Sequence, residues 1–185
     1  QGTATVALPW QLANPSLTAM TVPLPDNRLF YLEPGYIFCT GEAATVQAVL
    51  GSSVAVCLWD RRLRIGGMNH FLFPQAASAQ DATACYGNVA TATLLKMLEK
   101  AGSKRRNLLA LVLGGGRPYG SPQNALGEKN VEAARTVLRN KGVVVTSEDV
   151  GGHMGRKVVF DTRTGHIMVL KVHRIRATDW LTEEH

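Results

Sequence analysis

A polar turn and a histidine further along are the residues of this sequence whose types suit covalent chemistry. The stretch LGSSVAVCLWD carries Gly51, Ser52 and Ser53 into an apolar run, and GGMNHFLFP places His70 seventeen residues after Ser53. Hydrolysis of an amide requires a nucleophile, a base within hydrogen-bond reach and N–H donors for the oxyanion. An antiparallel return of the chain brings His70 beside Ser53. A serine and a histidine at this spacing are also expected by chance, so the spacing leaves a catalytic pair and an ordinary turn both open.

The segments that must position this pair predict an α+β fold with mixed sheets. Apolar residues at helical spacing predict helices over 86–102 and 128–142, each ending at a glycine. Strand-like runs occur at 28–40, 44–50, 53–59, 63–73, 107–113, 142–162 and 165–173. Strands and helices do not alternate regularly, which favours mixed sheets over a doubly wound parallel sheet.

The composition predicts one cytoplasmic domain preceded by an N-terminal extension. The chain has 185 residues, of which 45% are hydrophobic, so we expect a single compact domain over 28–185. Residues 1–27 are rich in Pro, Thr and Ala and are predicted to form an extended arm. The N-terminal stretch lacks the pattern of an export signal, and no apolar run approaches the roughly 20 residues of a membrane helix. We therefore expect no direct insertion into a membrane.

Charge and cysteine usage argue against several classes of protein. The formal charge is +6, but the cations lie in scattered clusters without interleaved aromatics, so no nucleic acid partner is expected. A solvated basic face or an acidic protein partner fits this charge better. The three cysteines are widely spaced, without the pattern of a zinc site, and the glycine-rich stretches are not phosphate-binding loops. We therefore predict no metal and no cofactor, and a buried, unreactive Cys57.

Five stretches, in this order along the chain, resemble the bacterial chemoreceptor glutamine deamidases of the CheD family: LGSSVAVCLWD, IGGMNHFLFP, LGGGRPYG, LGEKNVEAA and DVGGHMGRKVVFDTRTG. The resemblance extends from about Glu33 to about Val172. It implies a layered α/β/β fold related to the deamidating bacterial cytotoxins. It also implies hydrolysis of glutamine side chains on helices of chemoreceptors, the methyl-accepting chemotaxis proteins, to glutamate and ammonia. The chemotaxis phosphatase CheC is the second partner that the resemblance implies.

The resemblance also assigns catalytic roles. The family's Leu-Gly-Ser-Cys-Val motif has its cysteine nucleophile where this chain has Ser53, and the histidine of Gly-Gly-Met-x-His-Phe, the base, matches His70. A threonine that orients the histidine lies six residues before the nucleophile, at the position of Gln47. The side-chain carbonyl of Gln47 is an acceptor of the kind that an imidazole N–H requires. Ser53 is the more serious departure, because a serine hydroxyl is far less acidic than a cysteine thiol. We therefore expect a nearly inactive chain.

Three origins of Ser53 remain open from the sequence. It is a deliberate Cys→Ser replacement, the mark of a natural paralogue that has kept only the binding surface, or the nucleophile of a natural serine hydrolase. The leading function is accordingly a protein-glutamine deamidase with a disabled nucleophile. The alternative is a non-catalytic adaptor that binds chemoreceptors or CheC through the same groove.

Several residues near the pair are predicted to shape the turn or bind substrate. They are Gly51, Ser52, Asn69, Gly151, Gly152 and Arg156. The N–H of Ser53 is the candidate oxyanion donor. Asn69 precedes His70, so it is either a ligand for the amide or a polar residue at a strand edge. Arg156 lies in the last family stretch, and a structural ion pair is its alternative role.

Overall fold

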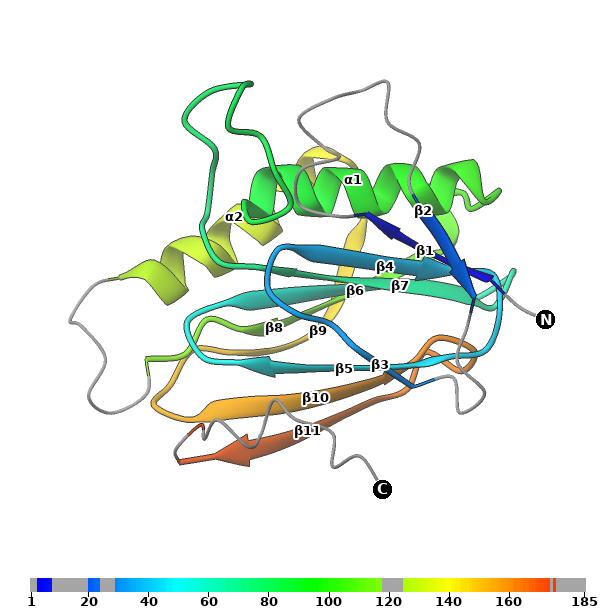
Figure 1. The fold of residues 1–185 in the computed structure, drawn as a ribbon. Helices are drawn as coiled ribbons and strands as arrows, with labels where there is room; N and C mark the ends of the chain where they lie inside the picture. Colours follow the sequence, from blue (N-terminus) through cyan, green and yellow to red (C-terminus); the bar gives the residue numbers. More distant parts are fainter. Residues whose placement is uncertain (1–2, 8–19, 24–28, 118–124, 174, 176–185) are drawn as a thin grey trace.

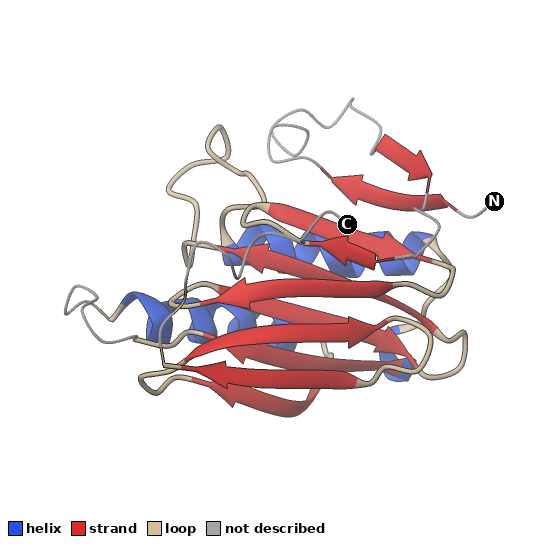
Figure 2. Ribbon diagram, turned by 60° about the horizontal axis from the view of Figure 1, so that its bottom comes forward, coloured by secondary structure: helices blue, strands red, loops and turns tan. Residues whose placement is uncertain are grey.

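The chain forms three layers in the computed structural model, which describes residues 3–7, 20–23, 29–117, 125–173 and 175. Two helices cover one face of a seven-stranded sheet, and a four-stranded sheet packs against the other face (Figure 1). Figure 2 shows the same layers from below, with the helices behind both sheets. This confirms the predicted layered α+β fold with mixed sheets.

The larger sheet has the strand order β2-β1-β4-β7-β6-β8-β9. Its central strands β7, β6 and β8 are mutually antiparallel, whereas the edge strand β9 runs parallel to β8. The strands are β1 (Thr3–Ala7), β2 (Met20–Pro23), β4 (Tyr36–Thr40), β6 (Val54–Asp60), β7 (Ile65–Phe71), β8 (Leu108–Gly114) and β9 (Val144–Val150). The antiparallel pairing of β6 and β7 is what brings the two candidate catalytic residues together.

The smaller sheet has the order β11-β10-β5-β3. Strand β5 pairs antiparallel with β10 and parallel with the short β3. The strands are β3 (Leu29–Tyr31), β5 (Thr45–Leu50), β10 (Gly155–Asp161) and β11 (Ile167–Val172). Because β5 leads directly into the Gly51–Ser53 turn, this turn links the two sheets.

Both predicted helices are present and end near the expected glycines. Helix α1 spans Gly87–Lys100 and helix α2 spans Leu126–Asn140, and a short 3₁₀ helix, η2, covers Arg105–Asn107. Gly102 and Gly142 follow the two helices with φ of +96° and +69°, the left-handed conformation that glycine adopts easily after a helix.

Two hydrophobic cores lie on opposite faces of the larger sheet, and β6 contributes to both. Val54, Val56 and Leu58 join the core beneath the helices, whereas Ala55 and Cys57 join the core between the sheets. This division follows from the alternation of side chains along a strand. Cys57 is fully buried as predicted, and burial raises the pKa of its thiol, so it is no source of a reactive thiolate.

The N-terminal segment differs from the predicted arm, because part of it is paired with the domain. Strand β1 adds to β4 at the edge of the larger sheet, and β2 pairs with β1. An unpaired sheet edge accepts an extended segment through backbone hydrogen bonds, which accounts for the difference. Residues 8–19 and 24–28 lie outside the described residues, and the division at residue 27 stays a prediction. No helix in the described part of the chain is long and apolar enough to cross a membrane.

Candidate active site

Ser53 and His70 lie in direct contact, as the antiparallel arrangement predicts. His70 in β7 pairs with Ala55 in β6, and Ser53 precedes Ala55 by two residues on the same face. The Oγ of Ser53 lies 2.9 Å from Nε2 of His70, which is a good hydrogen-bond distance. Both residues are buried, and Ser53, at 6% exposure, is the more exposed member of the pair.

The second ring nitrogen of His70 fixes the tautomer. Its Nδ1 lies 2.9 Å from the carbonyl oxygen of Leu32, which can only accept a hydrogen bond. In a neutral imidazole one nitrogen carries the proton, so this contact assigns it to Nδ1. Nε2 is then a bare acceptor that faces the hydroxyl of Ser53. This is the tautomer that a general base requires.

Burial keeps the ring neutral. Loss of solvation lowers the pKa of His70 from 6.5 to about 4, and the hydrogen bond to the Leu32 carbonyl opposes this shift only in part. Near neutral pH the imidazole is therefore unprotonated and able to take a proton. A neighbouring thiolate would favour the charged ring, but a neutral hydroxyl gives it no such support.

Gln47 does not orient His70 through its side chain as predicted. Val46, Ala48 and Leu50 of β5 face the core between the sheets, so Gln47 points to the opposite face of the smaller sheet. Its Oε1 is buried and has no hydrogen-bond partner among the described residues. The Gln47 carbonyl instead accepts a 2.7 Å hydrogen bond from the N–H of Leu32, and the Leu32 carbonyl holds the ring. Gln47 therefore contributes through its backbone.

The turn that carries Ser53 is anchored by its carbonyl groups. The oxygens of Gly51 and Ser53 accept hydrogen bonds of 2.8 Å from the N–H groups of Gly116 and Gly115. The oxygen of Ser52 accepts a 2.9 Å bond from the side chain of Asn130. Within the described residues the structure gives no acceptor for the N–H of Ser53. This N–H is therefore still available as the predicted oxyanion donor.

Glycines let three backbone segments approach closely behind this turn. A Cβ on Gly114, whose φ is +104°, would collide with the carbonyl oxygen of Ser53. A Cβ on Gly127, in the first turn of α2, would collide with the carbonyl oxygen of Gly115. Gly114 and Gly115 therefore support the turn that carries Ser53.

Asn130 is a structural residue of the site that the sequence analysis missed. It is fully buried on α2, and its Nδ2 donates to the carbonyl of Ser52 at 2.9 Å and to that of Leu72 at 2.8 Å. One amide nitrogen thus ties the segment before the nucleophile to the segment after His70. Its Oδ1 is buried without a partner among the described residues. The sequence offered one signal for this role, namely that Asn130 is a polar residue next to the apolar Val131 in a stretch predicted to be helical.

The side chain of Asn69 points away from Ser53. It is fully buried, and neighbouring residues of a strand point to opposite faces, so it faces α1 rather than Ser53. Its Oδ1 accepts from the N–H of Val56 at 2.8 Å, and its Nδ2 lies 3.2 Å from Oγ1 of Thr91. Both ends of the amide are therefore used within the fold.

Arg156 forms a structural ion pair, which was the alternative role predicted for it. Its guanidinium is 3% exposed and contacts Asp149 Oδ1 at 2.8 Å and 3.0 Å. It also donates to the carbonyls of Gly151 and Met154. Four of its five N–H donors are thus used within the fold, and a contact with substrate stays a prediction. The residue holds the 151–154 turn against β9.

Gly151 and Gly152 lie behind the nucleophile turn. The N–H of Gly151 donates to the carbonyl of Gly114 at 2.9 Å, and the carbonyl of Gly152 accepts from the N–H of Arg117 at 2.8 Å. Both glycines line a cavity of about 200 Å³ together with Gly115 and other residues near the start of α2. Their contact with substrate stays a prediction.

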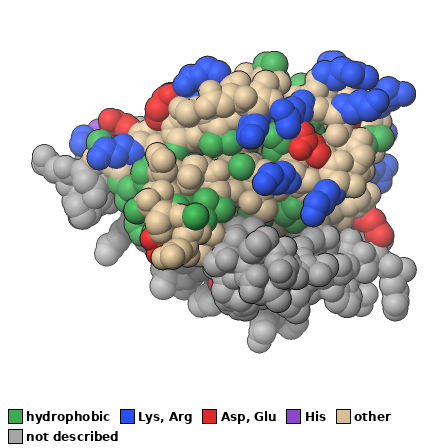
Figure 3. Space-filling model, turned by 90° about the horizontal axis from the view of Figure 1, so that it is seen from above, with side chains coloured by type: hydrophobic (Ala, Val, Ile, Leu, Met, Phe, Trp, Pro, Cys, Tyr) green, Lys and Arg blue, Asp and Glu red, His purple; other side chains and the backbone are tan. Residues whose placement is uncertain are grey.

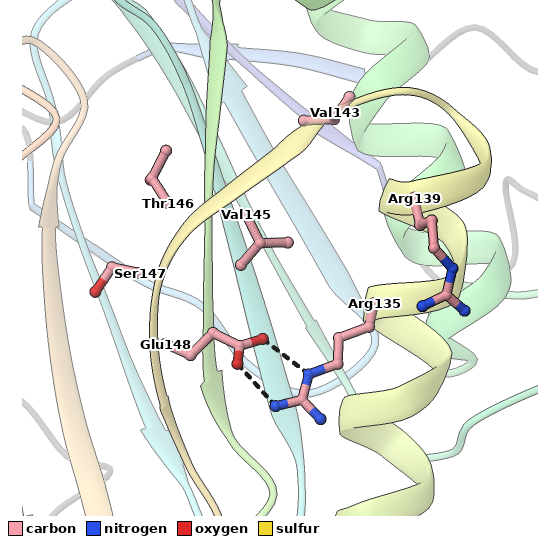
Figure 4. Close-up of a pocket in the computed structure, with 7 residues that line it drawn as sticks. All are labelled: Arg135, Arg139, Val143, Val145, Thr146, Ser147 and Glu148. Atoms are coloured by element: carbon pink, nitrogen blue, oxygen red, sulfur yellow. Dashed lines mark hydrogen bonds and ion pairs between the residues drawn. The ribbon is translucent and has the colours of Figure 1, made fainter.

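Two further cavities lie on the described surface. The larger, of about 570 Å³, lies between α2 and β9 and is lined by neither Ser53 nor His70; a 2.7 Å ion pair joins Arg135 and Glu148 across it (Figure 4). The other, of about 250 Å³, lies next to Leu32, whose carbonyl contacts His70. Its lining residues are Phe30, Tyr31, Leu32, Glu33, Tyr36 and Phe38. One of these residues, Tyr36, is paired with His70 across strands β4 and β7.

The described part of the chain contains no group of three or more His, Cys, Asp or Glu side chains that could hold a metal ion. Burial raises the pKa of Cys39 to about 12, so this thiol stays protonated in the core.

The fold and the site define a layered α+β protein with a buried, hydrogen-bonded serine–histidine pair at the junction of its two sheets. Comparison with known proteins identifies the family. The family profile described as "CheD chemotactic sensory transduction" matches residues 72–171. The chain belongs to the CheD family.

Relatives in this family cover most of the chain. The "Probable chemoreceptor glutamine deamidase CheD" of Sulfurimonas denitrificans is 35% identical over 147 residues, which span 78% of this chain and 94% of that protein. The protein of the same name from Trichlorobacter lovleyi is 38% identical, spanning 77% and 89%. The one from Methylobacillus flagellatus is 33% identical, spanning 94% and 91%.

Proposed function

We propose that the Ser53–His70 site is the deamidation site of a chemoreceptor glutamine deamidase, in which serine occupies the position of the nucleophilic cysteine. The observation that carries this proposal is the 2.9 Å contact between Ser53 Oγ and the bare Nε2 of a neutral His70. The names of the relatives supply the substrate class, a glutamine side chain on a chemoreceptor.

The reaction consumes water and releases ammonia. As the nucleophile attacks the carboxamide carbon, His70 Nε2 takes its proton, and the N–H of Ser53 is the donor for the oxyanion. His70 then returns the proton to the leaving nitrogen, ammonia departs, and an acyl-enzyme remains. Water, deprotonated by His70, attacks the acyl carbon, which restores the nucleophile and leaves a glutamate side chain on the receptor.

Serine makes this reaction slow in the chain as it stands. A thiol has a reference pKa of about 8.5, and a nearby imidazole can hold it as the thiolate, whereas a hydroxyl keeps its proton until the moment of attack. The shorter C–O bond also leaves Oγ further from the substrate than sulfur would be, and a misplacement near 1 Å costs on the order of 10²-fold. We infer that the serine form is nearly inactive.

The substrate that suits this site is a receptor helix that presents one glutamine to Ser53. The aromatic cavity next to Leu32 and Tyr36 offers a contact for apolar side chains beside the target glutamine. CheC is a second partner in this proposal. A CheD-like adaptor that binds receptor or CheC without turnover is the alternative, and Ser53 itself is what favours it.

Peptide mass spectrometry of a glutamine-bearing receptor fragment separates the two functions. The fragment is incubated with the chain as it stands and with Ser53→Cys, while binding is measured in parallel. Conversion of glutamine to glutamate by Ser53→Cys supports the deamidase. Equal binding by both forms, with no conversion by either, would instead establish the adaptor.

A further inference from the structure

Three chain reversals meet at the end of the larger sheet that is opposite to Ser53. They are the turn between β6 and β7, the connection from α1 to β8, and the connection from α2 to β9. The N–H of Arg61 donates to the carbonyl of Asn107 at 3.3 Å, which joins the first two. Nη1 of Arg105 lies 3.4 Å from the carbonyl of Lys141, which joins the last two. The three reversals therefore form one continuous surface.

This surface carries the net positive charge of the chain. Nine cations lie on it, and we call them the basic end: Arg61, Arg62, Arg64, Lys100, Lys104, Arg105, Arg106, Arg139 and Lys141. The three reversals themselves contain two carboxylates among the described residues, Asp60 and Glu99, so their net charge is +7, against a formal +6 for the whole chain. The rest of the protein is thus almost neutral.

The two carboxylates are already used within the fold. Asp60 is buried, and its Oδ1 accepts the N–H groups of Arg62 and Leu63 at 2.8 Å and 2.9 Å. Glu99 pairs with Arg105 at 2.6 Å. Neither neutralises the outer surface of the basic end.

Most of the basic end has no counter-charge. Among the described residues, no acidic partner lies within ion-pair distance of seven exposed cations, namely Arg61, Arg62, Arg64, Lys100, Lys104, Arg106 and Lys141. Figure 3 shows the helix layer from above, where Lys and Arg side chains outnumber the carboxylates over the right-hand part of the face. Clustered like charges repel one another, and a bound anionic surface relieves that repulsion.

We propose that the basic end binds the anionic headgroups of a phospholipid bilayer. Its tips are turns rather than a groove, so they meet a planar surface together, whereas a helical protein partner fits a groove better. Leu63, 45% exposed between Arg62 and Arg64, adds an apolar side chain at the tip, and cations with an apolar anchor suit a lipid interface. The basic end contains no aromatic side chain on which a nucleic acid base could stack.

The geometry keeps lipid binding separate from the Ser53–His70 site. Ser53 precedes β6 and the basic end begins where β6 finishes, and a seven-residue strand is roughly 20 Å long. A bilayer held at the basic end therefore leaves the pair accessible. The proposal does not depend on deamidation, since it rests on charge and shape alone.

Co-sedimentation with vesicles tests the proposal. The full chain is mixed with vesicles of phosphatidylcholine alone or with phosphatidylglycerol at about 30%, in about 0.1 M salt. We expect binding only to the anionic vesicles, and its loss in about 1 M salt. The double variant Arg62→Glu/Arg106→Glu should bind at least about tenfold more weakly. The control Lys129→Glu/Lys171→Glu makes the same change in net charge at exposed sites toward the opposite end of the sheets and should bind like the parent.

Two results would overturn the proposal. One is equal binding to neutral and anionic vesicles, and the other is an equal loss in both double variants, which would reduce the effect to net charge. Absence of vesicle binding, together with salt-sensitive binding of a receptor fragment that Arg62→Glu/Arg106→Glu abolishes, would assign the basic end to an acidic protein instead. Thermal unfolding of each variant shows whether its fold is intact.

Discussion

The carbonyl oxygen of Leu32 and Nδ1 of His70 lie 2.9 Å apart, and this contact decides which ring nitrogen meets Ser53. The carbonyl in turn is held in place because the N–H of Leu32 donates to Gln47. A backbone chain from β5 through Leu32 to His70 therefore does what a side chain was predicted to do. The base is oriented by the fold itself, whatever residue stands at position 47.

The neutral, buried His70 makes stability depend on pH. Its pKa is about 4 in the folded chain against an ordinary 6.5, so the unfolded chain binds more protons between these values. The contribution is fully present above about pH 6.5 and is lost as the pH falls through about 4, a change of about 3 kcal/mol. Urea unfolding of the parent and of His70→Gln at a series of pH values should show this slope only in the parent. Parallel curves for the parent and His70→Gln would show that His70 is not buried in its neutral form.

Asn130 should act as a positioning residue for the nucleophile turn. Asn130→Ala removes the donor from the carbonyls of Ser52 and Leu72, and we expect a loss of about 2 kcal/mol of stability. In the Ser53→Cys background we also expect kcat to fall at least about tenfold with KM nearly unchanged, since the turn and not the binding surface shifts. Steady-state ammonia release measures both constants. Reduced stability with an unchanged kcat would limit Asn130 to a structural role.

Gly127 tests the close packing behind Ser53. A Cβ there would meet the backbone of Gly115 and Gly116, which cannot move without displacing the nucleophile turn. Gly127→Ala should therefore lower the free energy of unfolding by about 2 kcal/mol in urea titrations. Gly41→Ala is the matched control, because a Cβ on Gly41 meets nothing within 4 Å. Equal, small effects for both would contradict the proposed packing.

Arg156 and Arg135 offer a matched pair of arginine–carboxylate contacts that differ in burial. The side chain of Arg156 is 3% exposed and that of Arg135 is 39% exposed. Arg156→Met should cost about 3 kcal/mol of stability, because it leaves buried carbonyls and Asp149 short of donors, whereas Arg135→Met should cost under about 1 kcal/mol. Thermal and urea unfolding measure the difference. A higher KM for receptor in Arg156→Met, without loss of stability, would instead support the predicted role of Arg156 in substrate binding.

The sequence predicted the parts of the site that depend on local patterns. The short β6–β7 connection made an antiparallel pair the natural arrangement, and the structure joins Ser53 to His70 accordingly. Glycines at the ends of the periodic segments marked the helix ends. The family stretches added the layered fold, which the alternation of strands and helices alone did not specify.

Two physical causes account for what the sequence did not show: strand alternation and long-range contacts. Asn69 adjoins His70 in the sequence, and Gln47 lies six residues before Ser53, but strand alternation turns both side chains away from the pair. Leu32 and Asn130 were missed because their contacts cross 38 and 78 residues of sequence. A backbone carbonyl leaves no side-chain signature, and long-range contacts require the tertiary fold.

Ammonia release from a glutamine-bearing receptor fragment is the most direct test of the central claim that Ser53 and His70 form a nucleophile-and-base pair. Three variants are compared with the parent: Ser53→Cys, Ser53→Ala, and Ser53→Cys combined with His70→Gln. We predict that Ser53→Cys alone releases ammonia at least about 10²-fold faster than the parent, and that the other two variants release none above background. Two results would contradict it. One is release by the Ser53→Cys/His70→Gln variant that is as fast as release by Ser53→Cys. The other is release by the parent and by Ser53→Ala that is as fast as release by Ser53→Cys.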